Sequence, residues 1–140
     1  MIFLSQGVGQ TKQLSRQLAA QPSQRIFALV GDLGSGKTTF VRAFLKSLGV
    51  KGPVTSPTFL IMRSYQLAKG RYRKAYHIDC YRLSQFKELA DLGFKKVVSD
   101  PDNALLIEWA DKVKRLIPLG ALWIEFKHGR GKNERIISFK

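Results

Sequence analysis

The sequence is short of the residues that build covalent or metal cross-links. It has one cysteine, Cys80, and two histidines, His77 and His128. A single cysteine excludes an intramolecular disulfide and any zinc site built from several cysteines. Two histidines are too few for a histidine-rich metal centre. Cys80 has no adjacent base, so we interpret it as a packed thiol rather than a nucleophile.

Long apolar segments are also missing. The longest wholly apolar run is 26–30, whereas about 20 residues are needed to span a bilayer. Residues 1–5 lack the basic and then apolar stretches of a signal peptide, and neither end carries a lipidation motif. We therefore expect a cytoplasmic protein with no membrane-inserted part.

Acidic residues are scarce and unevenly placed. The 140 residues include 24 Lys and Arg against 10 Asp and Glu, for a net charge of +14. Residues 1–78 hold twelve bases and one acid, Asp32, whereas 79–140 hold the other nine acids. The excess of base indicates an anionic partner such as nucleic acid or an acidic protein surface. A hydrophobic content of 44% argues against a disordered polycation, and the length predicts one domain, residues 1–140.

The order of apolar and amphipathic segments predicts an α/β fold, with a mostly parallel sheet flanked by helices and with antiparallel hairpins. The segment 25–31 is apolar on both faces, which is typical of a parallel strand covered by helices. Gly49 is well placed to end a helix over 37–48. The other expected elements are a helix over 11–20, strands over 59–67 and 71–79 around a turn at 68–70, a helix over 85–92, a strand over 104–108, and a final hairpin of 122–127 with 135–139.

Residues 31–38 carry the clearest motif. They read Gly-Asp-Leu-Gly-Ser-Gly-Lys-Thr, which matches every fixed position of G-x-x-x-x-G-K-[ST]. An apolar strand precedes the motif and a helix follows it, as a phosphate-binding loop requires. Backbone N–H groups of such a loop surround a phosphate, and we expect Lys37 to reach the β- and γ-phosphates and Thr38 to ligate Mg²⁺. The motif predicts binding of a nucleoside triphosphate without saying what the nucleotide is used for.

Two carboxylates lie where a metal ligand is expected. Asp79 and Glu108 each end an apolar strand, and strand ends beside a phosphate-binding loop commonly supply an oxygen ligand for Mg²⁺. Such a carboxylate can also orient the attacking water. For Asp79 the alternative is a surface acid or a helix cap, and Asp32 is the other acid near the loop. His77 shares a strand face with Asp79, and we interpret it as structural support.

Taken together, five segments resemble the TsaE (YjeE) family. These are bacterial P-loop ATPases of tRNA threonylcarbamoyladenosine synthesis. The order and spacing of the segments match over most of the chain, and the combination is far more specific than the loop alone. The matching segments are Gly31–Thr39, the Ser-Pro-Thr-Phe of 56–59, the His-Ile-Asp-Cys-Tyr-Arg of 77–82, the Glu-Leu-Ala-Asp-Leu-Gly of 88–93, and the Ile-Glu-Trp of 107–109.

The resemblance implies a fold, cofactors and partners. It implies a P-loop sheet with helices on both sides, and slow hydrolysis of ATP with Mg²⁺. It also implies docking onto the complex of the TsaD and TsaB proteins, in which TsaD transfers the threonylcarbamoyl group to the adenosine beside the anticodon. The ATPase cycle would reset that complex between turnovers.

The resemblance also assigns residue roles by matching motif. Lys37, Asp79 and Glu108 are the expected catalytic residues, and Thr38, Asp79 and Glu108 the expected metal ligands. Residues 56–58 would form a switch-like loop. Two departures are Ala110, where many members have proline, and Ser35, where alanine is usual. The expected nucleotide-binding residues are Thr11, Leu33, Gly34, Ser35, Gly36, Lys37, Thr38, Thr39 and Trp109.

Two other functions fit the same residues. One is a small-molecule kinase on a minimal P-loop core, and the other is a basic tRNA-binding module with a weak ATPase. A basic run bears on the second: it is either a solvated face or a docking surface for tRNA phosphates or an acidic partner. Tyr81 and Arg82 either brace the acidic loop or face a partner. The basic run comprises Arg63, Lys69, Arg71, Arg73 and Lys74.

Overall fold

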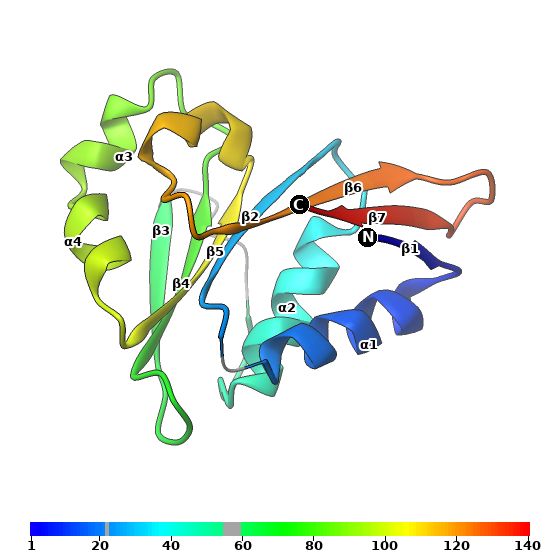
Figure 1. Ribbon diagram of the computed structural model, residues 1–140, viewed down its shortest axis with the longest axis horizontal. Helices are drawn as coiled ribbons and strands as arrows, with labels where there is room; N and C mark the ends of the chain where they lie inside the picture. Colours follow the sequence, from blue (N-terminus) through cyan, green and yellow to red (C-terminus); the bar gives the residue numbers. More distant parts are fainter. Residues whose placement is uncertain (22, 55–59) are drawn as a thin grey trace.

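A computed structural model describes residues 1–21, 23–54 and 60–140, which form one sheet of seven strands with helices on both faces (Figure 1). The strand order is β1-β7-β6-β2-β5-β4-β3. The strands are β1 (Ile2–Ser5), β2 (Ile26–Gly31), β3 (Met62–Gln66), β4 (Lys74–Asp79), β5 (Asn103–Glu108), β6 (Leu122–His128) and β7 (Arg135–Phe139). The helices are α1 (Val8–Ala19), α2 (Lys37–Ser47), α3 (Lys87–Asp91), α4 (Phe94–Ser99) and the 3₁₀ segment η1 (Ala110–Leu116).

The centre of the sheet is parallel and its edges are antiparallel. Strand β2 pairs in parallel with β5 and β6, and β4 pairs in parallel with β5. At one edge β3 is antiparallel to β4, and at the other β7 is antiparallel to both β6 and β1. The predicted α/β class, with a mostly parallel core and antiparallel hairpins, is confirmed.

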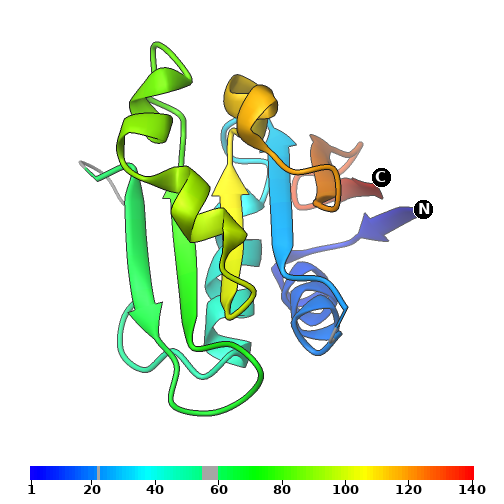
Figure 2. The same ribbon diagram turned by 60° about the vertical axis from the view of Figure 1, so that its left-hand side comes forward.

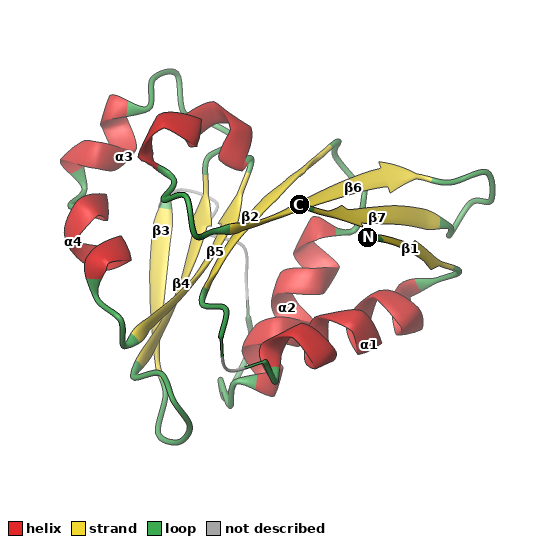
Figure 3. Ribbon diagram, viewed as in Figure 1, coloured by secondary structure: helices red, strands yellow, loops and turns green. Residues whose placement is uncertain are grey.

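Helices cover the two faces in separate layers (Figures 2 and 3). Because successive strand residues point to opposite faces, Phe27 packs with Phe44 of α2, at a ring separation of 4.7 Å. Its neighbour Ala28 packs on the other face, in a cluster that includes Leu89 of α3 and Phe94 of α4. This double burial explains the continuous apolar run of β2.

Several element boundaries differ from the sequence expectations. Helix α1 begins at Val8, one turn before 11–20, and strand β1 was not expected at all. Helix α4 was also missed: the chain turns at Gly93, whose φ of +84° favours glycine, and a second short helix follows. Strand β3 begins at Met62, and Phe59, where the strand was predicted to begin, lies outside the described residues.

The topology brings distant residues to one edge of the sheet. The carboxyl ends of β2, β5 and β4 point the same way because these strands are parallel. The loop after β2, the end of β4 and the end of β5 therefore meet there. Within the described residues, no helix is long and apolar enough to cross a membrane.

Candidate nucleotide site

The loop between β2 and α2 has backbone angles that glycine favours. Gly31 has φ +145°, and a Cβ there would lie 2.4 Å from the carbonyl oxygen of Phe126 on β6. Gly34 and Gly36 have φ of +73° and +105°, in the left-handed region that side chains disfavour. Helix α2 starts directly after the loop at Lys37, so its unpaired N–H groups face the same space.

Lys37 is buried and held by the loop itself. Its Nζ donates to the carbonyl oxygens of Asp32, at 2.9 Å, and of Gly31, and it lies 3.4 Å from the Ser35 hydroxyl. The ammonium also sits 4.4 Å from the centroid of the Trp109 ring. Burial lowers the pKa of Lys37, and nearby carboxylates, Glu108 foremost, oppose that shift. Backbone carbonyls and an aromatic face thus take the place of water around this cation.

The two predicted carboxylates are neighbours across the sheet. The register of β4 with β5 pairs Asp79 with Glu108. Glu108 is 3% exposed; its Oε1 accepts from the Thr38 hydroxyl at 3.4 Å, and its Oε2 lies 2.5 Å from His77 Nε2. Asp79 Oδ1 accepts from the backbone N–H of Tyr81 at 3.0 Å. Burial raises the pKa of Asp79, and the charge of Glu108 adds to that rise, whereas the Tyr81 N–H opposes it.

The donor set fits a small divalent cation such as Mg²⁺. Thr38, Asp79 and Glu108 present one hydroxyl and two carboxylates, which are the hard oxygen donors that Mg²⁺ takes. Across the described residues, no group of three or more His, Cys, Asp or Glu side chains is arranged to hold a metal. Mg²⁺ in phosphate-transfer sites commonly keeps few protein ligands and takes phosphate oxygens for the rest. Asp32 does not line this space; it is exposed and borders a separate groove with Trp123 and Glu125.

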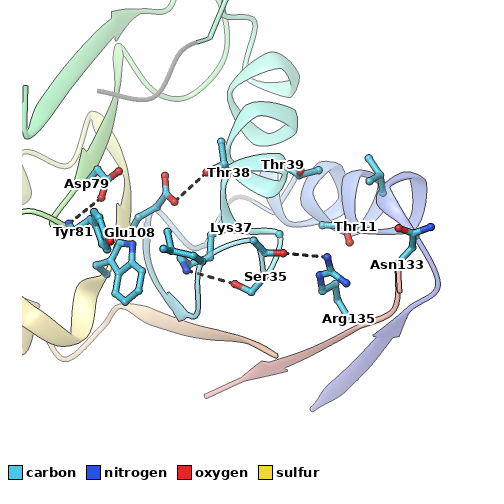
Figure 4. Close-up of a pocket in the computed structure, with 16 residues that line it drawn as sticks. Thr11, Ser35, Lys37, Thr38, Thr39, Asp79, Tyr81, Glu108, Asn133 and Arg135 are labelled. Atoms are coloured by element: carbon cyan, nitrogen blue, oxygen red, sulfur yellow. Dashed lines mark hydrogen bonds between the residues drawn. The ribbon is translucent and has the colours of Figure 1, made fainter. Parts of the chain in front are cut away.

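A cavity of about 260 Å³ joins the loop to the carboxylates (Figure 4). Asp79 and Glu108 lie at one end of it, and Thr11, Asn133 and Arg135 at the other. The P-loop forms the wall between the two ends. The lining residues are Gly7, Val8, Thr11, Leu33, Gly34, Ser35, Gly36, Lys37, Thr38, Thr39, Asp79, Tyr81, Glu108, Trp109, Asn133 and Arg135.

The backbone is strained at Trp109, directly after Glu108. Its φ of +55° is the one positive value among the described residues other than glycine, and costs on the order of 1 kcal/mol or more. This conformation accompanies the placement of the indole in the cavity wall, beside Lys37 and 5.0 Å from the Tyr81 ring. An aromatic surface therefore lines the cavity next to the carboxylates.

Comparison with known proteins identifies the family. The profile described as "Threonylcarbamoyl adenosine biosynthesis protein TsaE" matches residues 5–137. The chain belongs to the TsaE family. The Bacillus subtilis tRNA threonylcarbamoyladenosine biosynthesis protein TsaE is 36% identical over 132 residues, covering 93% of this chain and 78% of the relative. The protein of the same name from Borreliella burgdorferi is 35% identical over 102 residues, covering 73% and 72%. The crystal structure of YdiB from Bacillus subtilis superposes with a TM-score of 0.78 at 29% identity, covering 99% of this chain and 83% of that one.

All the residues to which the TsaE resemblance assigned a catalytic, metal-binding or nucleotide-binding role line the cavity. Residues 56–58, predicted as a switch-like loop, lie outside the described residues. Thr11 does not open α1; it lies one turn inside the helix, with its hydroxyl 2.8 Å from that of Ser5. Ser35, one of the two departures from the TsaE pattern, places its hydroxyl beside Lys37.

Five residues that line the cavity were not predicted from the sequence: Gly7, Val8, Tyr81, Asn133 and Arg135. Arg135 Nη2 donates to the carbonyl oxygen of Gly34 at 3.0 Å, which ties the β6–β7 hairpin to the P-loop. The sequence does not single out Asn133 or Arg135, because the hairpin geometry decides which side chains reach the cavity. Tyr81 belongs to the family-like segment of 77–82, and this segment is the sequence signal that could have identified it as a cavity residue.

Four residues of the basic run, Lys69, Arg71, Arg73 and Lys74, lie in or next to the turn between β3 and β4. The fifth, Arg63 on β3, pairs with His77 of β4 and lies nearer the carboxylates. Lys69 and Arg71 are exposed in the turn between β3 and β4. Strand β4 leads from that turn to Asp79, so the turn is roughly 20 Å from the carboxylates. Arg73 is 85% exposed and makes one ion pair, 3.8 Å long, with Asp102. Cys80 is fully buried, and burial raises the pKa of its thiol to about 12, so the predicted packed thiol is confirmed.

Proposed function

We propose that this member of the TsaE family is a Mg²⁺-dependent ATPase that supports threonylcarbamoyl transfer to the adenosine beside the tRNA anticodon. One observation carries the proposal: the P-loop, Lys37, Thr38 and the paired carboxylates Asp79 and Glu108 border one cavity. A phosphate-binding loop alone would support only nucleotide binding. Two carboxylates opposite the loop add the groups that hydrolysis requires.

The loop would bind the phosphates through its backbone. The N–H groups that start α2 face the cavity, and the helix dipole favours an anion there. Lys37 would exchange its bonds to the carbonyl oxygens of Gly31 and Asp32 for phosphate oxygens. Since burial already lowers its pKa, an anionic partner would stabilise the ammonium strongly.

Thr38, Asp79 and Glu108 would hold Mg²⁺ on the side of the cavity away from Arg135. The metal would neutralise charge on the phosphate oxygens. Glu108, which is buried and fixed by two contacts, would orient the attacking water and accept its proton. Asp79 would assist from the adjacent strand, on the same sheet edge.

The other end of the cavity would take the nucleoside. Thr11 lies there with Asn133 and Arg135, and the base would have apolar contact with Val8. Trp109 would pack near the phosphates, where its ring already contacts the Lys37 ammonium. ATP and Mg²⁺ are therefore the cofactors we propose.

The biosynthetic role comes from the family, and it supplies the partners. We propose that one folded domain, residues 1–140, docks onto the complex of TsaD and TsaB in the cytoplasm. The separate basic turn of β3–β4 would then lie free to approach tRNA or an acidic surface. Its distance from the cavity allows nucleotide binding and this contact to occur together.

Reconstitution tests the proposal. ATP hydrolysis by the purified chain should release free phosphate, depend on Mg²⁺, and rise when TsaD and TsaB are added, with tRNA added last. A phosphorylated small product would instead identify a kinase. Tight, salt-dependent tRNA binding that survives Lys37→Ala, without stimulated hydrolysis, would identify a tRNA-binding module.

A further inference from the structure

The Glu108 carboxylate enters the cavity with both oxygens engaged. Its Oε1 faces the Thr38 hydroxyl at 3.4 Å, and its Oε2 meets His77 Nε2 at 2.5 Å. His77 is 1% exposed and Glu108 3%, so solvent does not screen their contact. The shorter of the two contacts is therefore the one that sets where this carboxylate points.

The contact also indicates which ring nitrogen of His77 carries a proton. We assign the proton to Nε2, because a carboxylate accepts hydrogen bonds and Nε2 is the ring nitrogen that faces Oε2 of Glu108. Nδ1 is buried and has no hydrogen-bond partner among the described residues. The ring therefore contributes one directed bond at this site, and that bond is to Glu108.

Strand β4 places the His77 imidazole next to the two carboxylates. His77 and Asp79 are two residues apart and share a face of the strand. The register with β5 sets Asp79 beside Glu108 and His77 two pairs further back, beside Leu106. Strand β4 thus supplies the Asp79 carboxylate and also the His77 imidazole, which contacts Glu108 on β5.

We propose that His77 is a positioning residue for the ATPase reaction: its Nε2–H holds Oε2 of Glu108 so that Oε1 faces Thr38 and the cavity. This inference rests on the proposed function. Without the imidazole, the glutamate would gain rotamer freedom and leave one oxygen buried without a donor. Groups that orient a catalytic or metal-binding carboxylate commonly contribute about 10- to 100-fold to activity or metal affinity.

Two substitutions separate this role from simple packing. His77→Leu removes the donor and keeps an apolar body, and we expect kcat to fall at least about ten-fold while KM for ATP changes little. His77→Gln retains an N–H that can reach Glu108, and it should restore much of kcat. In a Glu108→Gln background, His77→Leu should cause little further loss, because both changes act through one carboxylate. Thermal unfolding identifies the variants that remain folded.

A spectroscopic measurement tests the contact without any turnover. The chain has two histidines, so ¹H–¹⁵N correlation spectra of the imidazole rings are simple to assign with His128→Gln. We expect His77 to carry its proton on Nε2, with a shifted Nε2–H resonance that moves in Glu108→Gln. A proton on Nδ1, or a resonance insensitive to Glu108→Gln, would overturn the proposal.

The kinetic and the spectroscopic measurements together distinguish a failure of the proposed ATPase function from a failure of the positioning role of His77. If the wild-type chain hydrolyses no ATP, the proposed function fails, while the spectra still report whether His77 holds Glu108. If the wild-type chain is active and folded His77→Leu retains full kcat, the positioning role is wrong and the ATPase stands. Equal loss in His77→Leu and in folded His77→Gln would also overturn it, because a donor at this position would then make no difference.

Discussion

The two ends of the cavity are built from different kinds of structure. At the carboxylate end, Glu108 is buried on a central strand, with contacts to His77 and Thr38. At the other end, Asn133 is exposed in the β6–β7 connection, and Val8 is 56% exposed at the start of α1. One end is part of the parallel core, and the other is assembled from elements at the sheet edge.

Under the proposed function, this difference gives the two ends of the cavity different tasks. Groups that take part in a reaction must be held within a fraction of an ångström, which packed central strands achieve. Groups that only bind the nucleoside tolerate more movement, because their contacts are similar before and during the reaction. Substitutions at the carboxylate end should therefore lower kcat. Substitutions at the opposite end, formed by α1 and the β6–β7 hairpin and called here the hairpin end, should raise KM.

The largest effect is expected where the loop meets the carboxylates. Lys37→Ala and Glu108→Ala should each lower ATP hydrolysis by about 100-fold or more, because each removes a charge that acts on the reacting phosphate. Phosphate release measures the loss, and circular dichroism checks the fold. Neither variant should support tRNA modification in a depleted strain. Full rescue by either would overturn the mechanism.

A smaller, metal-dependent effect is expected at the predicted ligands. Asp79→Ala and Thr38→Ala should weaken hydrolysis most at limiting Mg²⁺, since each removes one oxygen donor. Titrating Mg²⁺ at saturating ATP measures the shift in half-maximal activity. Asp91→Ala is the matched control, because that acid is exposed on α3 and does not line the cavity. An unchanged Mg²⁺ dependence in both ligand variants would reject them as metal ligands.

Substitutions at the hairpin end of the cavity should weaken ATP binding. Arg135→Ala removes the bond to Gly34 and a cation at the cavity, and we expect KM for ATP to rise up to about ten-fold, equivalent to ~1.4 kcal/mol, with kcat nearly unchanged. Arg130→Ala, in the β6–β7 connection that leads to Arg135 but outside the cavity lining, serves as the control. A loss confined to kcat would contradict the division between the two ends.

Substitutions in the basic turn should leave the cavity unaffected. Charge reversal at Lys69, Arg71 and Arg73 should not change unstimulated ATP hydrolysis, because the turn is roughly 20 Å from the carboxylates. Association with tRNA or with an acidic partner should weaken, most clearly at low salt. Identical association at low salt would show that this turn is solvated surface.

The smallest effect is expected at Cys80, which follows Asp79 in the chain and is fully buried. With a thiol pKa of about 12, Cys80 stays protonated below that pH while the chain is folded, and its reaction with an alkylating reagent at pH 8 should be negligible. Unfolding returns the thiol to an ordinary pKa near 8.5, so alkylation at pH 8 should then be rapid. Mass spectrometry counts the adduct. Rapid alkylation of the folded chain would show that the carboxylate end is open.

Much of the carboxylate end could be predicted from sequence because it is recorded in contiguous segments. The motif of 31–38 holds its glycines, Lys37 and Thr38 within eight consecutive residues, and Asp79 and Glu108 each end an apolar strand. The helix at 94–99 and the strand at 2–5 were missed because they are short and owe their stability to packing and edge pairing. The hairpin end was missed for a related reason: the register of β6 with β7 selects Asn133 and Arg135 for the cavity.

Local composition and spacing are enough to find the P-loop, the two carboxylates and the excess of base. Three other features became visible only in the fold: Asp79 and Glu108 lie side by side, His77 contacts Glu108, and Asp32 borders a different groove. The first two depend on strand register. Pairing β4 with β5 brings together residues 29 positions apart, and a shift of one residue would turn these side chains to the opposite face.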